Sequence, residues 1–139
     1  MREILFRGKR IDNGEWVEGA FLNDRDGAFY ICPSVSDISY GDGGERRRIG
    51  CWYKVDPSTV GQYTGLKDKN GERIFEGDIV QAHFKTNHSK QIFRVAFDYG
   101  TFIFNNGYVK VPVSGIYRIK VIGNIHDNPE FMKEGANNG

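Results

Sequence analysis

Residues 67–80 read KDKNGERIFEGDIV, and this stretch predicts how the chain around it folds. Its first part, 68–71, is a tight-turn sequence, because Asn and Gly tolerate the positive φ angles of hairpin turns and Asp can bond the backbone two residues on. Glu76-Gly77-Asp78 is a second turn, and Ile79 and Val80 begin an apolar strand. We therefore expect a hairpin, a returning arm and a second turn that starts a core strand. The turn residues are Asp68, Asn70, Gly71, Gly77 and Asp78.

A shorter version of this phrase, DNGEWVEGAFL, occurs at residues 12–22. Here Asn13 and Gly14 make the predicted turn, residues 15–18 form the returning arm, and Gly19 breaks the chain before Ala20. The copy at 67–80 has one more residue in its arm. Because side chains alternate with period two, that residue either reverses the buried face or is absorbed as a bulge. Turn geometry, and not catalysis, explains both copies.

Glycine punctuates the rest of the chain in the same way. The sequence has 18 Gly and 4 Pro, and the Gly residues fall between short apolar or alternating runs, which is typical of a β-rich chain. The predicted strands are 4–7, 15–22, 28–32, 60–63, 73–75, 79–84, 92–97, 101–104, 108–111 and 117–125.

Two of these runs show the alternation of a half-buried strand. Phe93, Val95 and Phe97 are expected on one buried face, and Tyr117, Ile119 and Val121 are expected on another. Turns at Tyr99-Gly100 and at 105–107 would fold residues 92–111 into a meander.

A short C-terminal helix is predicted after Asn128, which can cap it. Pro129 suits the first helical position and Glu130 favours the positive helix end. Residues 33–50 are small, polar and Gly-rich without periodicity, and they predict a long, mobile loop.

The expected fold class is mainly β, that is β-rich α+β with antiparallel strands. The C-terminal part is expected to form an SH3-like small barrel or sheet, because the 76–80 segment is followed by a bent hairpin and a closing strand. We expect one domain over 1–139, with an N-terminal β unit at 1–32, the mobile loop at 33–50, and a main β unit with the helix at 51–131.

Composition excludes several classes of protein. The formal net charge is +1, so no global field steers the chain toward a polyanion or a membrane. Cys32 and Cys51 lack the spacing of a zinc site and are expected to be free, buried thiols. No apolar stretch approaches the roughly 20 residues that cross a bilayer. The expected location is the cytoplasm.

No set of residues has the spacing of an active site. His83 and His88 lie five positions apart on a strand and its following loop, so they are not expected to face one metal ion, and His126 is far from both in sequence. Glu76 and Asp78 could act as an acid–base pair, but turn residues of this type usually bond backbone amides. We expect no catalytic residues, no metal, no cofactor and no enzyme activity.

Candidate partner contacts are basic and aromatic. Arg46, Arg47 and Arg48 could meet phosphates, although Asp42 and Glu45 partly offset their charge. Trp52 could stack a nucleic-acid base, or it could enter the core of a strand. The remaining candidates could also contact a partner, and the alternative interpretation is that each is an ordinary surface residue. They are Lys85, Lys90, Arg94, Tyr99 and Lys110, together with His88.

The order of these motifs resembles the YopX family, which is encoded by bacteriophages and prophages. The residues that carry the resemblance are 6–10, 13–17, 55–71, 76–80 and 121–130, and they span nearly the whole chain. The resemblance supplies no catalytic residues and implies self-association, so a homo-oligomer is expected. The expected function is that of a phage-encoded accessory protein of unknown biochemical activity in the bacterial cytoplasm, acting by binding or self-assembly. The alternatives are a nucleic-acid-binding small barrel and a modulator that binds a host protein.

Overall fold

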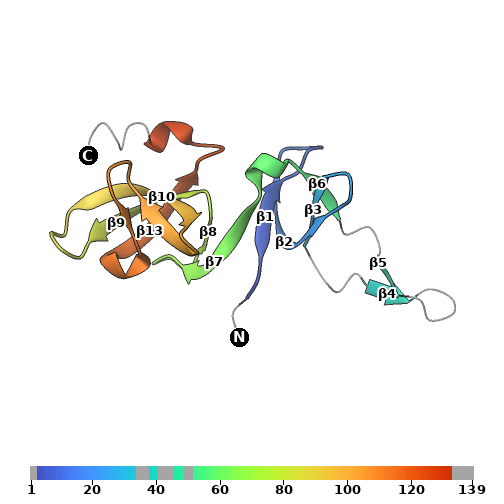
Figure 1. Ribbon diagram of the computed structural model, residues 1–139, viewed down its shortest axis with the longest axis horizontal. Coiled ribbons are helices and arrows are strands. Elements are labelled where there is room, and N and C mark those ends of the chain that lie inside the picture. The colour runs from blue at the N-terminus through green and yellow to red at the C-terminus, as the bar shows by residue number, and fades with distance from the viewer. Residues whose placement is uncertain (1–2, 34–37, 41–45, 49–51, 133–139) are drawn as a thin grey trace. The chain divides into compact units, whose positions relative to one another are not determined.

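The computed structural model describes residues 3–33, 38–40, 46–48 and 52–132 (Figure 1). The chain folds as two compact units, Met1–Gln62 and Tyr63–Gly139. The strands in both units pair antiparallel, which confirms the expected mainly β class. Within the described ranges, no helix has the length and apolar character needed to span a membrane.

The first unit is a sheet that curls around a small aromatic core. Its strands follow the order β6-β3-β2-β1, and the first residues of β7 pair with the free edge of β1. The elements are β1 (Phe6–Lys9), β2 (Trp16–Asn23), β3 (Phe29–Cys32), β6 (Tyr53–Val55), the 3-10 turn η2 (Pro57–Thr59) and β7 (Gly61–Lys67). Ile31 and Val55 are fully buried, and the ring of Phe21 contacts the rings of Phe6 and Phe29.

Two short strands lie between β3 and β6. Residues Ile38–Tyr40 (β4) and Arg46–Arg48 (β5) pair antiparallel, so the prediction of one long loop over 33–50 missed this pair. Runs of three residues are too short to show an alternation. The predicted main β unit at 51–131 also began too early. In the structure β6 pairs with β3 and Val55 bridges Arg10, so β6 belongs to the first unit.

The structure corrects the role predicted for Gly19, which was expected to break the chain between two segments. It lies inside the continuous strand β2 and does not break the chain before Ala20. A Cβ at Gly19 would lie 1.8 Å from the carbonyl oxygen of Cys32 on β3. The residue is therefore Gly because the two backbones approach closely, which is the other common reason for Gly in a strand.

The second unit contains a five-stranded sheet in the order β12-β11-β10-β9-β13, and β8 pairs separately with the C-terminal part of β7. The elements are β8 (Arg73–Phe75), β9 (Asp78–Phe84), β10 (Lys90–Asp98), β11 (Thr101–Asn105), β12 (Lys110–Val111), the 3-10 turn η3 (Val113–Gly115) and β13 (Ile116–Asn124). Its core consists of Ile74, Val80, Ala82, Phe93, Val95, Phe104 and Ile116. Across the described residues of this unit the sheet does not close into a barrel.

The predicted meander turns are present in this sheet. Tyr99 and Gly100 have φ angles of 52° and 77°, and Gly107 has a φ of 97°, as tight turns require. Phe97 departs from the expected pattern, because it is 53% exposed although Phe93 and Val95 on the same side are buried. It lies near the end of β10 and packs its ring edge-on against Phe102 at 5.1 Å.

The C-terminal helix begins where it was predicted. Residues 129–132 are helical, and the Phe131 N–H donates to the carbonyl oxygen of Asn128 at 3.1 Å. The side chain of Asn128 accepts a hydrogen bond from the Asn124 N–H at 3.3 Å. It lies directly over Gly123, where a Cβ would come within 2.5 Å of Asn128 Oδ1.

The first turn of the 67–80 segment is fixed by the carboxylate of Asp68, which is only 7% exposed. Asp68 Oδ1 accepts from the N–H groups of Asn70 at 2.8 Å and Glu72 at 2.9 Å. Asp68 Oδ2 accepts from the N–H of Val121 on β13 at 2.9 Å. The Lys69 N–H also donates to the carbonyl of Ile119 at 2.9 Å. The turn is therefore attached to the middle of β13.

The second turn connects two strands of the sheet through its backbone. The N–H of Gly77 donates to the carbonyl of Val95 at 2.8 Å, and the carbonyl of Gly77 accepts from Ile125 at 2.9 Å. Gly77 has a φ of 91°, which favours glycine. The buried carboxylate of Asp78 accepts from the Phe75 N–H at 2.7 Å, which confirms its predicted role in the turn.

The two copies of the phrase build different hairpins. In the first copy, Asn13 Oδ1 accepts from the Glu15 N–H at 2.9 Å, and this bond stays within the turn. In the second copy, the pairing of β7 with β8 shifts register between Tyr63 and Lys67, around Gly65 with a φ of 87°. Four steps along β7 face two along β8, so the bulge lies in β7 and does not absorb the extra residue of the arm at 73–75.

We expect Asp68→Ala to lower the free energy of unfolding by about 2–4 kcal/mol, because it leaves three backbone N–H groups without their acceptor. Urea denaturation monitored by circular dichroism measures this loss. Asn13→Ala, which removes only a local bond in an exposed turn, is the matched control and should cost about 1 kcal/mol or less. Equal losses in the two variants would contradict a structural role for the bond between Asp68 and Val121.

The same carboxylate should make stability depend on pH. Burial raises the pKa of Asp68, but hydrogen bonds from the Val121, Glu72 and Asn70 amides and the charge of Lys120 outweigh it, so the pKa is lower than usual. A lowered folded-state pKa gives a stabilisation that is complete above the unfolded pKa of about 3.9 and is lost as the pH falls through the folded value. The stability difference between the wild type and Asp68→Asn should therefore stay constant down to about pH 5 and shrink as the pH falls below about 4. Parallel pH curves for the two proteins would contradict this.

Candidate functional site

The five-stranded sheet has two chemically different faces. Val80 and Ala82 of β9 point into the core, whereas the alternating residues Gln81 and His83 are partly exposed on the other side. We call this second side the outer face. His83 is paired with Lys90 of β10 on one side and with Tyr117 of β13 on the other. A basic and an aromatic side chain thus flank His83 in one row across three strands.

A β-bulge in β13 places Tyr117 on the outer face. The pairing with β9 shifts register between Tyr117 and Lys120, and Arg118 has a φ of 53°. Beyond the shift, Val121 pairs with Val80 and packs against the core together with Ile119. The prediction that Tyr117 shares a buried face with Ile119 and Val121 was therefore wrong, because the bulge reverses the alternation.

Tyr117 is the centre of an aromatic cluster with His83 and His88. The rings of His83 and Tyr117 lie 5.3 Å apart at an angle of 31°. The hydroxyl of Tyr117 shares a 2.8 Å hydrogen bond with His88 Nδ1, and the two rings meet nearly edge-on. His88 itself has a φ of 60°. Positive φ angles in residues other than Gly cost about 1–3 kcal/mol each and are typical of functional sites.

The hairpin between β9 and β10 is held rigidly around His88. The Phe84 N–H donates to the Ser89 carbonyl at 3.0 Å, and the His88 N–H donates back to the Phe84 carbonyl at 2.9 Å. The Lys85 N–H donates to the carbonyl of Gly115, just before β13, at 3.0 Å. These bonds fix the hairpin relative to the strand that carries Tyr117.

Exposed cations surround the aromatic cluster. Lys90 and Arg94 lie on the outer side of β10, Lys120 lies opposite Gln81, and Lys85 follows His83 by two residues. We call these four residues the basic face. Within the described residues, none of the four forms a salt bridge or a side-chain hydrogen bond. The Arg118 guanidinium adds a further cation 5.9 Å from the centre of the Tyr117 ring.

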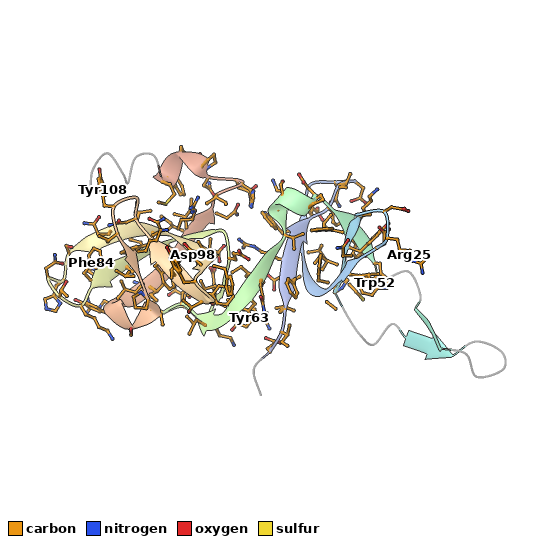
Figure 2. All side chains as sticks on the ribbon, in the orientation of Figure 1. Arg25, Trp52, Tyr63, Phe84, Asp98 and Tyr108 are labelled. Carbon is orange, nitrogen blue, oxygen red and sulfur yellow. The ribbon has the colours of Figure 1, made fainter. Side chains whose placement is uncertain are left out.

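Two more predicted contacts, Tyr99 and Lys110, lie toward the far end of β10, and Lys110 is in one row with Arg94 across Asn105 of β11. Figure 2 shows Phe84 and Asp98 at opposite ends of the sheet, and Tyr99 follows Asp98. Tyr99 is 89% exposed, and the Lys110 ammonium lies 5.9 Å from its ring centre. Lys110 also pairs with Asp98 at 3.1 Å, so its charge is already partly compensated.

The other predicted contacts lie in the first unit. Trp52 is partly buried just before β6, and Arg46, Arg47 and Arg48 form β5, whose side chains lie outside the described part of the structure. Of the predicted set, the structure therefore brings together Lys85, His88, Lys90 and Arg94. Sequence reasoning missed Tyr117, His83, Arg118 and Lys120 as members of the same surface.

Cations of the first unit are engaged with aromatic rings and carboxylates. Arg7 lies 4.7 Å and Lys9 lies 5.8 Å from the centre of the Trp16 ring. Arg10 lies 4.0 Å from the centre of the Tyr53 ring and donates two hydrogen bonds to Asp12. These hydrogen bonds raise the pKa of Arg10 and lower that of Asp12. These contacts engage three of the cations of this unit.

Groups for metal or nucleophilic chemistry are sparse. His83 and His88 contact the same tyrosine, although their spacing did not predict that they would meet. The described ranges contain no group of three or more His, Cys, Asp or Glu that could hold a metal ion. Cys32 is buried, as expected, and Cys51 lies outside the described residues.

Comparison with known proteins agrees with the resemblance seen in the motifs. No curated protein matched the chain. Among solved structures, the chain is similar to the crystal structure of protein EF1440 from Enterococcus faecalis, with 28% sequence identity and a TM-score of 0.61. That match covers 95% of this chain and 99% of the other. The model of the YopX protein family matches residues 5–133. The chain belongs to the YopX family.

Proposed function

We propose that this protein acts by binding and not by catalysis, and that it binds nucleic acid on the outer face of the five-stranded sheet. The observation that carries the proposal is the basic face, where the side chains of Lys85, Lys90, Arg94 and Lys120 are all exposed and none forms a salt bridge among the described residues. Unpaired cations gathered on one surface are the electrostatic footprint of a nucleic-acid-binding protein.

The spacing of these cations favours a polyanion over a small anion. Lys90 and Arg94 lie on the same side of β10, and at about 3.3 Å per residue they are roughly 13 Å apart along the strand. Lys90 and Lys120 are on opposite sides of β9, on strands that each pair with it. One small anion cannot contact side chains spread over this area, whereas a chain of phosphates can.

The strand order supports an SH3-like assignment for the second unit. The meander β9-β10-β11-β12 is followed by η3 and by β13, which returns to pair with β9. We propose that this unit is an open relative of SH3-like small barrels, which commonly bind nucleic acids or peptides. This support is an analogy of fold, and the chemistry of the basic face favours nucleic acid as the ligand.

Membership of the YopX family supports the proposed setting. We propose that the protein is a phage-encoded accessory protein and works in the cytoplasm of the bacterial host. Binding to a host protein is the alternative outcome of the experiment below.

We expect the protein to bind single- or double-stranded DNA oligonucleotides with an affinity that falls steeply as salt is added. Fluorescence anisotropy over a series of salt concentrations measures it. Replacing Lys90, Arg94 and Lys120 with Ala should weaken binding and reduce the slope of log affinity against log salt by about two to three.

Two control variants separate this surface from other cations. Lys110→Ala removes a lysine that is paired with Asp98 and should change the slope little. A variant with Ala at Arg46, Arg47 and Arg48 tests the basic run predicted from the sequence. Absence of binding at low salt, or equal loss in the triple variant and in Lys110→Ala, would contradict the proposal.

Self-association is a second candidate function, favoured by exposed apolar side chains beside β12. Tyr108 is 71% and Val109 is 45% exposed, and both directly precede this edge strand of the sheet. Exposed apolar groups of this kind often mark an interface. A homo-oligomer that packs these side chains against a second copy is the form that we propose.

Light scattering tests this candidate. The wild type should have more than the mass of one chain at protein concentrations of tens of micromolar, an order of magnitude typical of stable interfaces. Replacing Tyr108 and Val109 with Ser should lower that mass, whereas Leu22→Ser, at an exposed site of the first unit, should not. A monomeric wild type would exclude self-association.

A further inference from the structure

The aromatic cluster of His83, Tyr117 and His88 is not required for phosphate contacts. A purely electrostatic surface needs only cations, yet β13 contains a bulge that turns Tyr117 away from the core and toward the basic face. Two of the three residues other than Gly that have positive φ in the described chain, His88 and Arg118, lie beside Tyr117. Bulges next to binding sites commonly re-aim a side chain in this way.

The geometry of the cluster fits a flat aromatic ligand. The rings of His83 and Tyr117 lie 5.3 Å apart and are inclined by only 31°, so they partly stack on each other, and both side chains remain partly exposed. The hydrogen bond between the Tyr117 hydroxyl and His88 Nδ1, at 2.8 Å, holds the phenol ring in one orientation. A preset ring loses little conformational freedom when a ligand stacks on it.

Cations lie on both sides of this surface. Lys90 is directly opposite His83 across the β9–β10 pair, and the Arg118 guanidinium is 5.9 Å from the centre of the Tyr117 ring. Lys85 follows His83 by two residues and lies directly after the end of β9. A base on the aromatic pair would therefore have its neighbouring phosphates within reach of positive charge.

We propose that the outer face takes single-stranded nucleic acid, with a base stacked on the His83–Tyr117 pair and the flanking phosphates held by Lys85, Lys90 and Arg118. This inference rests on the proposed function and narrows its ligand. Bases of a duplex are stacked inside the helix and cannot reach an aromatic surface, whereas an unpaired strand offers its bases freely. His88 is a positioning residue that acts through Tyr117.

The test compares a fluorescein-labelled oligothymidylate with the same strand paired to oligoadenylate, using the full chain. The single strand should bind more tightly than the duplex. Tyr117→Leu should weaken single-strand binding by about 5- to 150-fold, the effect of losing one stacked base, and leave duplex binding unchanged. Tyr117→Phe keeps the ring but loses the bond to His88, so its affinity should lie between that of the wild type and that of Tyr117→Leu.

A second readout reports stacking directly. An oligonucleotide containing 2-aminopurine should lose fluorescence when it binds the wild type or Tyr117→Phe, and should lose less with Tyr117→Leu. His83→Leu provides an independent variant if Tyr117→Leu does not fold, which circular dichroism shows.

The outcomes separate this inference from the proposed function. If the variant lacking Lys90, Arg94 and Lys120 loses binding but Tyr117→Leu and His83→Leu do not, phosphate binding stands and base stacking is overturned. Tighter binding of the duplex would also overturn the inference. If neither form of DNA binds at low salt, both the inference and the proposed function fail.

Discussion

The hydrogen bonds to the carboxylate of Asp68 position the strands on which the candidate site depends. Asp68 joins the turn at 68–72 to Val121, which lies 53 positions further along the chain. The adjacent bond from Lys69 to Ile119 engages the same stretch of β13. These bonds fix β13 just beyond its bulge, so Ile119 and Val121 face the core and Tyr117 faces outward. The site thus follows from a turn that contributes no residue to it.

The features that sequence reasoning predicted well are those set by local chemistry. Positive φ at Gly71, Gly77 and Gly107 follows from turn sequences that few other residues can adopt, and the structure contains these turns. The strands from 73 to 124 also lie close to their predicted bounds, because alternation and flanking turns define them. The link from Asp68 to β13 could not be predicted, since nothing near residue 68 identifies its distant partner.

The failures share a different cause, which is the close approach of segments distant in sequence. Gly19 resembles a turn glycine, but its role is set by the carbonyl of Cys32 on the neighbouring strand. Tyr117 fits a perfect alternation, but the bulge at Arg118 reverses its face. Of the candidate site, the cations Lys85, Lys90 and Arg94 were found by residue type alone. For its aromatic residues, the sequence placed Tyr117 on a buried face and did not predict that His83 and His88 would both contact it.

The central claim is that the bulge at Arg118 places Tyr117 on the outer face, next to the basic residues. Nuclear Overhauser contacts of the Tyr117 ring protons in the full chain test it most directly. The structure predicts contacts with the ring protons of His83 and His88, whose rings lie 5.3 and 5.8 Å from that of Tyr117. Contacts with the methyl groups of Val80 and Ala82, without contacts to either histidine, would show that Tyr117 is buried in the core and would contradict the claim.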